Sequence, residues 1–303
     1  MRLLDPAATA LALPYDKLVP AIADAAVQLA RGEIQAPERM VVPIDSSSVL
    51  LCMPAIGSDI GVTKLITVHG NNARHELPAI QGEVTVFERD TGRRLLLLDG
   101  PTVTARRTAA VTMLGIQRLL PRVPQSALLI GCGVQAAAHA DALAEVFGVA
   151  RLFVAGRDPA HAASFCEMLA ARHPGIDVQA ASTAASRDVD VVIALTTARS
   201  PVIPADLPPT TMAIGVGAFK PEMAELPPAL LHARRIVVDH FGGAKHEAGD
   251  LLQAGIDWSG VRELAEVVEH GVPASDAVPV FKTVGQAAWD LAAARVARAA
   301  LGA

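Results

Sequence analysis

Short apolar runs separated by turn residues fill most of about the first hundred residues. They predict strands at residues 41–44, 49–53, 63–68, 83–88 and 94–98. The Asp-Thr-Gly sequence at residues 90–92 supplies a hairpin turn between the last two runs. Helices are predicted at residues 15–31 and 108–120, the second ended by Pro121. This order is typical of an antiparallel sheet with flanking helices, because no helix separates successive strands.

The pattern changes after residue 126 to strands that alternate with helices of roughly 10–15 residues. The strands are predicted at residues 127–130, 151–155, 178–180, 189–195, 212–216 and 235–239. They are continuous apolar runs, as expected for strands that are buried on both faces of a parallel sheet. An alanine-rich helix is predicted at residues 284–301, packed either on the first domain or on a second subunit.

These patterns predict an α/β protein of two domains, in keeping with its 303 residues. Residues 121–279 are expected to form a doubly wound parallel sheet of the Rossmann type. Residues 1–120 together with 280–303 are expected to form a smaller α+β domain.

Composition excludes several classes of function. The chain is 51% hydrophobic and carries a net charge of −5 without long runs of like charge, so neither disorder nor a nucleic-acid partner is expected. No apolar stretch approaches the length of a membrane span and no signal peptide is visible, so no membrane partner is expected. Three cysteines without a CxxC pair favour a reducing, cytoplasmic location. The histidines match no metal-binding motif, and no metal is predicted.

The most specific local motif is the glycine-rich sequence at residues 131–136, Gly-Cys-Gly-Val-Gln-Ala, between a predicted strand and a predicted helix. Gly131 would allow the tight turn, and Gly133 would let the backbone approach a pyrophosphate. Ala136 would permit close contact between helix and strand. The pyrophosphate would then bind the free amides near Val134. This context predicts a dinucleotide-binding loop.

The end of the second predicted strand bears on the choice of dinucleotide. An acidic residue there would select NAD by binding the ribose hydroxyls. The chain has Arg157 instead, whose guanidinium can pair with a 2′-phosphate. NADP(H) is therefore the preferred cofactor, while the adjacent Asp158 leaves NAD(H) open.

Three basic residues of the first domain are candidates for binding a substrate: Arg39, Lys64 and Arg107. Arg107 is expected at the start of a helix of small residues, where backbone amides and a guanidinium would bind a carboxylate. Lys64 lies within an apolar run, so its ammonium needs either a partner or a substrate anion.

The motifs at residues 61–68, 104–110, 131–135 and 281–285 together resemble the ornithine cyclodeaminase/mu-crystallin family. The resemblance implies a homodimer in which the smaller domain, with the C-terminal helix, binds a small-molecule substrate and forms the subunit contact. It implies that Arg39, Lys64 and Arg107 bind the substrate carboxylate and act near its imine. The residues that it implies around the dinucleotide are Gly131, Gly133, Val134, Gln135, Arg157, Thr196, Val216, Lys282 and Thr283.

One departure from the family pattern bears on the reaction. Cyclodeaminases of the family carry an aspartate after the strand predicted at residues 212–216, and Phe219 stands at that position here. Because phenylalanine handles no proton, the resemblance favours the family's reductases over its cyclodeaminases, unless Glu222 replaces the missing acid. The expected reaction is NAD(P)H-dependent reduction of a cyclic ketimine carboxylate, Δ1-pyrroline-2-carboxylate or Δ1-piperideine-2-carboxylate, to L-proline or L-pipecolate. Ornithine cyclodeamination, an alanine dehydrogenase-like activity and a non-catalytic NADPH-dependent binding protein remain as alternatives.

Overall fold

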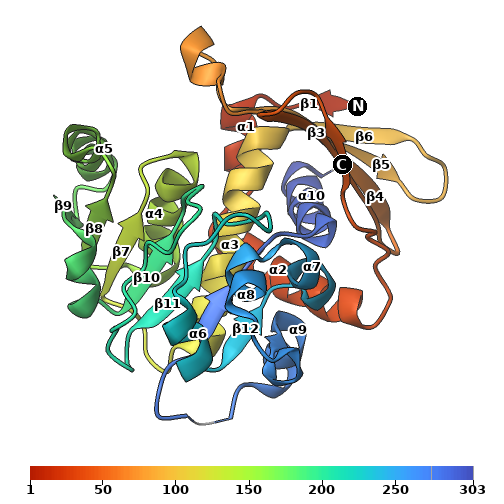
Figure 1. Cartoon of the computed structure of the whole chain (residues 1–303). Coiled ribbons are helices and arrows are strands. Elements are labelled where there is room, and N and C mark those ends of the chain that lie inside the picture. Colours follow the sequence, from red (N-terminus) through yellow and green to blue (C-terminus); the bar gives the residue numbers. More distant parts are fainter. Residues whose placement is uncertain (274, 303) are drawn as a thin grey trace. The chain divides into compact units, whose positions relative to one another are not determined.

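The computed structural model describes residues 1–273 and 275–302 (Figure 1). The chain divides into two compact units. The first consists of Met1–Ala110 and Gln286–Ala303, and the second of Val111–Gly285.

The first unit contains a six-stranded sheet in the order β1-β6-β5-β4-β3-β2. Neighbouring strands are antiparallel except for the short β1, which runs parallel to β6. The antiparallel sheet predicted from the apolar runs is therefore confirmed. The strands are β1 (Arg2–Leu3), β2 (Met40–Pro43), β3 (Ser48–Ile56), β4 (Ile60–His69), β5 (Ile80–Glu88) and β6 (Arg94–Asp99).

Helices cover one face of this sheet. The C-terminal helix α10 (Ala287–Leu301) packs against β3, β4 and helix α2 (Tyr15–Ala30). It therefore lies on the first unit of its own chain, which answers the question left open by the sequence (Figure 1). The chain also forms α1 (Pro6–Leu11) and the 3-10 turn η1 (Asn72–His75) in this unit.

Helix α3 (Gly100–Leu119) begins earlier than the predicted start at residue 108. The carboxylate of Asp99 accepts a hydrogen bond from the amide of Thr102 (2.9 Å) and thereby caps the first turn. Pro101 is tolerated there because the first amides of a helix have no intrahelical acceptor. Arg107 consequently lies about two turns into the helix. The prediction that helix N-terminal amides assist Arg107 in binding a carboxylate was wrong, since amides this far along bond within the helix.

The second unit is built on eight parallel strands in the order β13-β12-β14-β11-β10-β7-β8-β9. This arrangement confirms the predicted α/β class with its parallel sheet. The strands are β7 (Ser126–Ile130), β8 (Arg151–Ala155), β9 (Asp177–Ala180), β10 (Val191–Ala194), β11 (Met212–Gly215), β12 (Ile236–Val238), β13 (Arg262–Glu263) and β14 (Val280–Lys282). The helices of this unit, besides the end of α3, are α4 (Val134–Phe147), α5 (Pro159–Arg172), α6 (Pro228–Ala233), α7 (Phe241–Glu247), α8 (Gly249–Ala254) and α9 (Leu264–His270), with 3-10 turns η2 (Thr183–Arg187) and η3 (Trp258–Gly260).

The strand order reverses direction between β7 and β10. From β7 the chain continues outward to β8 and β9, and it then returns to β10 on the other side of β7. In doubly wound sheets this switch point opens a crevice at the carboxyl ends of the two central strands. The glycine-rich loop follows β7, so the fold brings it to that crevice.

The segment before the C-terminal helix differs from the sequence-based prediction. Lys282, which lies just before the helix predicted at residues 284–301, ends strand β14, and no strand was predicted there; β14 lies between β11 and β12. The helix begins at Ala287, where the side chain of Gln286 caps it, and not at residue 284. A three-residue strand has too little pattern to be recognised locally, and only its two neighbouring strands define it.

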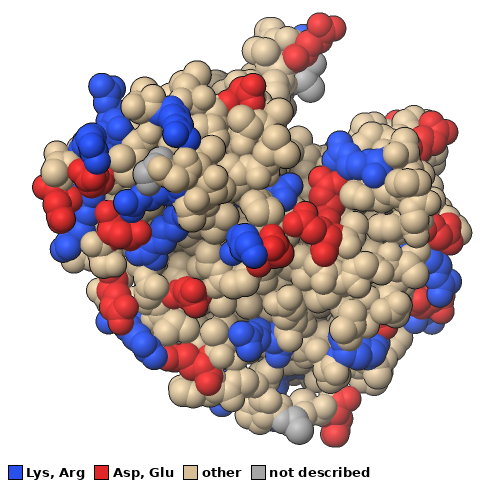
Figure 2. All heavy atoms as spheres, turned by 180° about the vertical axis from the view of Figure 1, so that it is seen from behind, with Lys and Arg blue, Asp and Glu red and all other residues tan. Residues whose placement is uncertain are grey.

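Charges of both signs are interspersed over the face in Figure 2. No helix among the described residues is both long enough and apolar enough to cross a membrane.

Candidate active site

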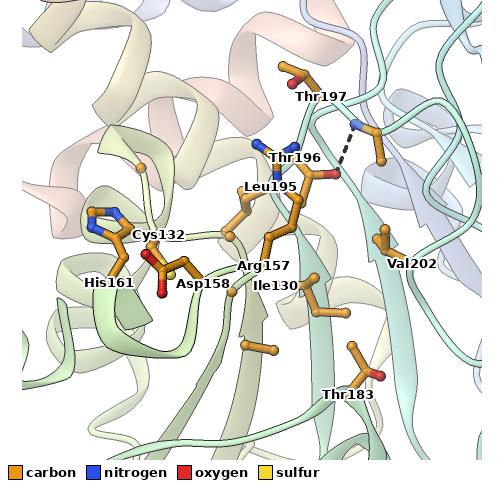
Figure 3. A pocket seen from close by; sticks show the side chains of 15 residues that line it. Ile130, Cys132, Arg157, Asp158, His161, Thr183, Leu195, Thr196, Thr197 and Val202 are labelled. Atoms are coloured by element: carbon orange, nitrogen blue, oxygen red, sulfur yellow. Dashed lines mark hydrogen bonds between the residues drawn. The ribbon is translucent and has the colours of Figure 1, made fainter. Parts of the chain in front are cut away.

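A cavity of about 760 Å³ opens at the carboxyl ends of β7, β8 and β10 (Figure 3). It contains four residues predicted to contact a dinucleotide: Gly131, Gly133, Arg157 and Thr196. The remaining lining residues are Ile130, Cys132, Ala155, Gly156, Asp158, His161, Thr183, Leu195, Thr197, Ala198 and Val202.

The glycine-rich loop has the backbone geometry that a pyrophosphate requires. Gly131 has a φ of +123°, and a Cβ there would stand 2.8 Å from the carbonyl oxygen of Leu195. Gly133 is the N-cap of α4, and a Cβ at this position would meet open space. No side chain in the described part of the chain caps this end of α4, so its first amides can bind an anion. The loop therefore fits a dinucleotide.

The loop after β8 and the first turn of helix α5 each bring a basic side chain to the cavity. Arg157 and His161 both line it (Figure 3). The carboxylate of Asp158 accepts a hydrogen bond from the amide of Ala160 (3.0 Å) and so serves as the N-cap of α5. A carboxylate engaged at a helix terminus has less capacity to bind a ribose, and this removes part of the ambiguity that Asp158 introduced.

The other residues predicted around a dinucleotide do not line this cavity. Val134 and Gln135 begin helix α4, and the side chain of Val134 is exposed. Val216 is buried directly after β11. The Lys282 ammonium is fully buried 3.0 Å from Asp250 Oδ2. The Thr283 hydroxyl donates to the carboxylate of Asp239 (2.7 Å).

The first unit contains a buried ionic cluster around Asp290 of α10. Its carboxylate lies 2.9 Å from the ammonium of Lys64 on β4 and 3.3 Å from Nε of Arg107. The side chains of Lys64 and Asp290 are 1% and 0% exposed, respectively. Lys64 therefore has the partner that its apolar surroundings require.

Burial is the main reason that the pKa of Lys64 is lowered to about 7. The positive charges of Arg107 and Arg39 lower it further, whereas Asp290 opposes the shift. A lysine with a pKa near neutrality can both hold and release a proton under ordinary conditions. Since the Lys64 ammonium and the Arg107 guanidinium share the one carboxylate of Asp290, the cluster also suits an anionic substrate.

Sequence reasoning missed Asp290. The available signal was an aspartate between Trp289 and Leu291, two bulky apolar residues, in an alanine-rich helix. A carboxylate surrounded by apolar neighbours is rarely buried unless a cation accompanies it. What could not be read was which cation, because Lys64 is 226 positions away.

The loop after β11 offers no obvious proton-handling acid. Phe219 is partly buried, and Glu222 is exposed. Glu225 is buried, but its carboxylate accepts four hydrogen bonds from neighbouring loops. Among the described residues, no group of three or more His, Cys, Asp or Glu side chains could hold a metal ion.

The crevice, its glycine-rich loop and the parallel sheet define a dinucleotide-binding protein of the Rossmann type. The chain belongs to the ornithine cyclodeaminase/mu-crystallin family, whose model matches residues 6–302. This confirms the family suggested by the motifs.

Several relatives of this chain are reductases, and an L-lysine cyclodeaminase of Streptomyces rapamycinicus is 33% identical over 91% of this chain and 83% of that protein. A Δ1-pyrroline-2-carboxylate/Δ1-piperideine-2-carboxylate reductase of Azospirillum brasilense is 46% identical over 299 residues, covering 99% of this chain and 96% of that protein. The ketimine reductase mu-crystallin of Rattus norvegicus is 32% identical over 88% of this chain and 85% of that protein. The Thermococcus litoralis Δ1-pyrroline-2-carboxylate reductase, solved in complex with NADH and L-proline, is 26% identical with a TM-score of 0.92, covering 99% of this chain and 97% of that one. The chain is accordingly an oxidoreductase of this family.

Proposed function

We propose that this chain uses NAD(P)H to reduce a cyclic ketimine carboxylate, Δ1-pyrroline-2-carboxylate or Δ1-piperideine-2-carboxylate, to L-proline or L-pipecolate. The observation that carries the proposal is the buried cluster of Lys64, Arg107 and Asp290, in which a lysine with a pKa near 7 adjoins a guanidinium. The reductase relatives at 44–46% identity support the same reaction.

The basic residues have two roles in this proposal. Arg107 and Arg39 bind the substrate carboxylate and thereby orient the ring. Lys64 donates a proton to the imine nitrogen, because an iminium accepts hydride far better than a neutral imine does. The nicotinamide cofactor supplies the hydride for the imine carbon. One proton and one hydride thus convert C=N to CH–NH, and Lys64 regains its proton from solvent.

NADP(H) is the proposed cofactor, with NAD(H) as an acceptable substitute. Arg157 in the cavity supports the preference, since its planar guanidinium matches a phosphate. His161 lines the same cavity and adds a second basic group. The engagement of Asp158 at the start of α5 also supports NADP(H), because that carboxylate is occupied elsewhere.

The proposal includes a homodimer formed through the smaller domain, residues 1–120 with 280–303. Support comes from the sheet face opposite Lys64, where Met40, Val42 and Leu65 are 61%, 43% and 44% exposed. The strand pairing puts these residues on one face, since Met40 and Leu65 both pair with Cys52, and Val42 pairs with Leu50. Apolar side chains gathered on one sheet face are typical of a protein interface. A cytoplasmic location stays a prediction.

The decisive test is the loss of NADPH absorbance on adding Δ1-pyrroline-2-carboxylate, beside parallel reactions with NADH and with L-ornithine plus NAD. Rapid NADPH oxidation without ammonia from ornithine is the expected result. Ammonia and proline from ornithine would establish a cyclodeaminase instead. NAD(P)H consumption that requires pyruvate and ammonia would establish an alanine dehydrogenase-like enzyme. Cofactor binding without turnover of any of these substrates would indicate a binding protein.

A further inference from the structure

We propose that Glu225 is the positioning residue of the cofactor cavity, because its buried carboxylate ties the loop after β10, which forms one cavity wall, to the loop after β11. The inference rests on the proposed use of a nicotinamide dinucleotide. Glu225 lies outside the motifs identified in the sequence. The same arrangement gives Lys282 a structural role in place of the cofactor contact predicted for it.

The side chain of Glu225 joins the two loops directly. Oε1 accepts hydrogen bonds from the amide and the hydroxyl of Thr196, at 2.6 and 2.8 Å. Oε2 accepts hydrogen bonds from the amides of Gly217 and Ala218, at 2.7 and 3.0 Å. Hydrogen bonds to an ionised carboxylate are about twice as strong as neutral ones, so this one side chain is a strong tie.

The backbone around Glu225 is also bonded to the cavity wall. Its carbonyl accepts hydrogen bonds from the amides of Val202 and Ile203, at 2.9 and 3.1 Å. The amide of Ala224 donates to the carbonyl of Ala198 (3.0 Å). The Thr196 hydroxyl, which donates to Glu225, also accepts from the amide of Ala198 (3.2 Å; Figure 3). Glu225 therefore contacts this cavity wall through its side chain and also through its backbone.

The two loops also pack closely against each other beside the Glu225 carboxylate. A Cβ on Gly217 would lie 1.9 Å from the carbonyl oxygen of Thr196 and 2.8 Å from Oε1 of Glu225. The two loops thus meet backbone to backbone, and only glycine fits at that contact. The carboxylate of Glu225 satisfies amides that would otherwise be buried without an acceptor.

A buried ion pair between Asp250 and Lys282 holds the backbone of Glu225 in place. Asp250 Oδ1 accepts hydrogen bonds from the amides of Glu225 and Leu226. Its other oxygen lies 3.0 Å from the ammonium of Lys282, and both side chains are fully buried. Burial raises the pKa of Glu225, and the nearby Lys282 charge opposes that rise. Lys282 on strand β14 therefore holds Asp250 in place, and Asp250 in turn binds the backbone of Glu225.

The arrangement suits positioning better than proton transfer. Both carboxylate oxygens of Glu225 are occupied by donors of the chain, and the residue is fully buried. Protonation would break a contact on one loop or the other. A carboxylate that accepts four hydrogen bonds, and so orders Thr196 and its neighbours, is the consistent interpretation.

The test replaces Glu225 with glutamine and measures the dissociation constant for NADPH by the cofactor's own fluorescence. The amide NH2 of Glu225→Gln must face donors of one loop, so at least one pair of contacts is lost. Affinity is expected to fall on the order of 10- to 100-fold. Glu222→Gln, an exposed glutamate three positions earlier in the same segment, is the matched control and should bind as the wild type does.

Steady-state kinetics separate positioning from general damage. For Glu225→Gln, KM for NADPH should rise, while KM for the imine and kcat at saturating NADPH stay near the wild-type values. In a double-mutant cycle of Glu225→Ala with Thr196→Val, the combined loss of affinity should be smaller than the sum of the two single losses, because each change removes the hydrogen bond between these two side chains. If Glu225→Gln does not fold, Glu225→Asp replaces it, and NADPH affinity should fall in this variant as well, because the shorter side chain cannot reach the donors of both loops.

Three outcomes would overturn the inference. These are unchanged NADPH affinity in Glu225→Gln, strictly additive losses in the cycle of Glu225→Ala with Thr196→Val, and unchanged NADPH affinity in Glu225→Asp where that variant replaces Glu225→Gln. A wild-type protein that binds NADPH but reduces no cyclic imine would end the proposed reaction while leaving this comparison of affinities valid. A wild-type protein that binds neither NADPH nor NADH would end both proposals.

Discussion

Asp290 is expected to set the pH range in which the enzyme is active, and Asp290→Asn tests this. The carboxylate lies 2.9 Å from the Lys64 ammonium and 3.3 Å from Arg107 Nε, and it is fully buried. Asparagine is nearly isosteric with aspartate, so the substitution removes the charge and keeps the shape. Asp290 raises the pKa of Lys64 against the effect of burial. Its loss therefore lowers that pKa from the value of about 7.

The size of the effect follows from the geometry. An opposite charge at this distance shifts a pKa by about 1–3 units. The pH profile of the variant should therefore shift to lower pH by about the same amount. Lys64 acts in its protonated form, so activity is lost as pH rises through its pKa. Well above pH 7, kcat/KM of the variant should accordingly be lower by roughly 10- to 1000-fold. Part of the loss should be recovered as pH is lowered.

The assay is the pH profile of kcat/KM for imine reduction, with NADPH affinity measured alongside. Asp24→Asn, which replaces an exposed aspartate on α2, is the matched control. The substrate's own ionisation is the same for all three proteins, so a difference between profiles comes from the enzyme. A profile of Asp290→Asn that keeps the wild-type falling limb, or that falls by one factor at every pH, would refute the reasoning.

Three further predictions follow from the same structure. Lys64→Met should lower kcat for imine reduction by about 10²- to 10⁴-fold with NADPH affinity unchanged; a normal rate would exclude Lys64 from the reaction. Arg157→Ala should raise KM for NADPH about 10- to 100-fold and leave KM for NADH nearly unchanged, and equal effects on the two cofactors would contradict the 2′-phosphate contact. Burial lowers the pKa of His139 from 6.5 to about 4. The folded state therefore binds fewer protons than the unfolded state between these values, and about 3 kcal/mol of stability should be lost as pH falls through them. Denaturant titrations of the wild type and His139→Gln across that range should show a smaller decline in the variant, and parallel declines would assign the loss to other groups.

Much of the fold could be predicted from local pattern. Apolar runs interrupted by turns gave the antiparallel sheet, and strands alternating with helices gave the parallel sheet, because these periodicities reflect which faces are buried. The glycine-rich loop was recognisable for a similar reason, since its turn and close approach restrict residue type over a few neighbouring positions. Element ends were less predictable. Helix α3 begins at Gly100 because the Asp99 carboxylate caps it, despite a glycine and a proline in its first turn.

The candidate site, like the fold, has features that the sequence predicts and others that depend on tertiary packing. The sequence by itself determined which basic side chains were available and that Lys64, in an apolar strand, required an anion. Only the tertiary structure decided that the anion is Asp290, 226 positions away, and that Lys282 pairs with Asp250. The physical reason is that charge pairing and pKa depend on burial and on distances between remote segments, which packing alone determines. Glu225 is such a case, because a single carboxylate joins loops whose proximity no local pattern reveals.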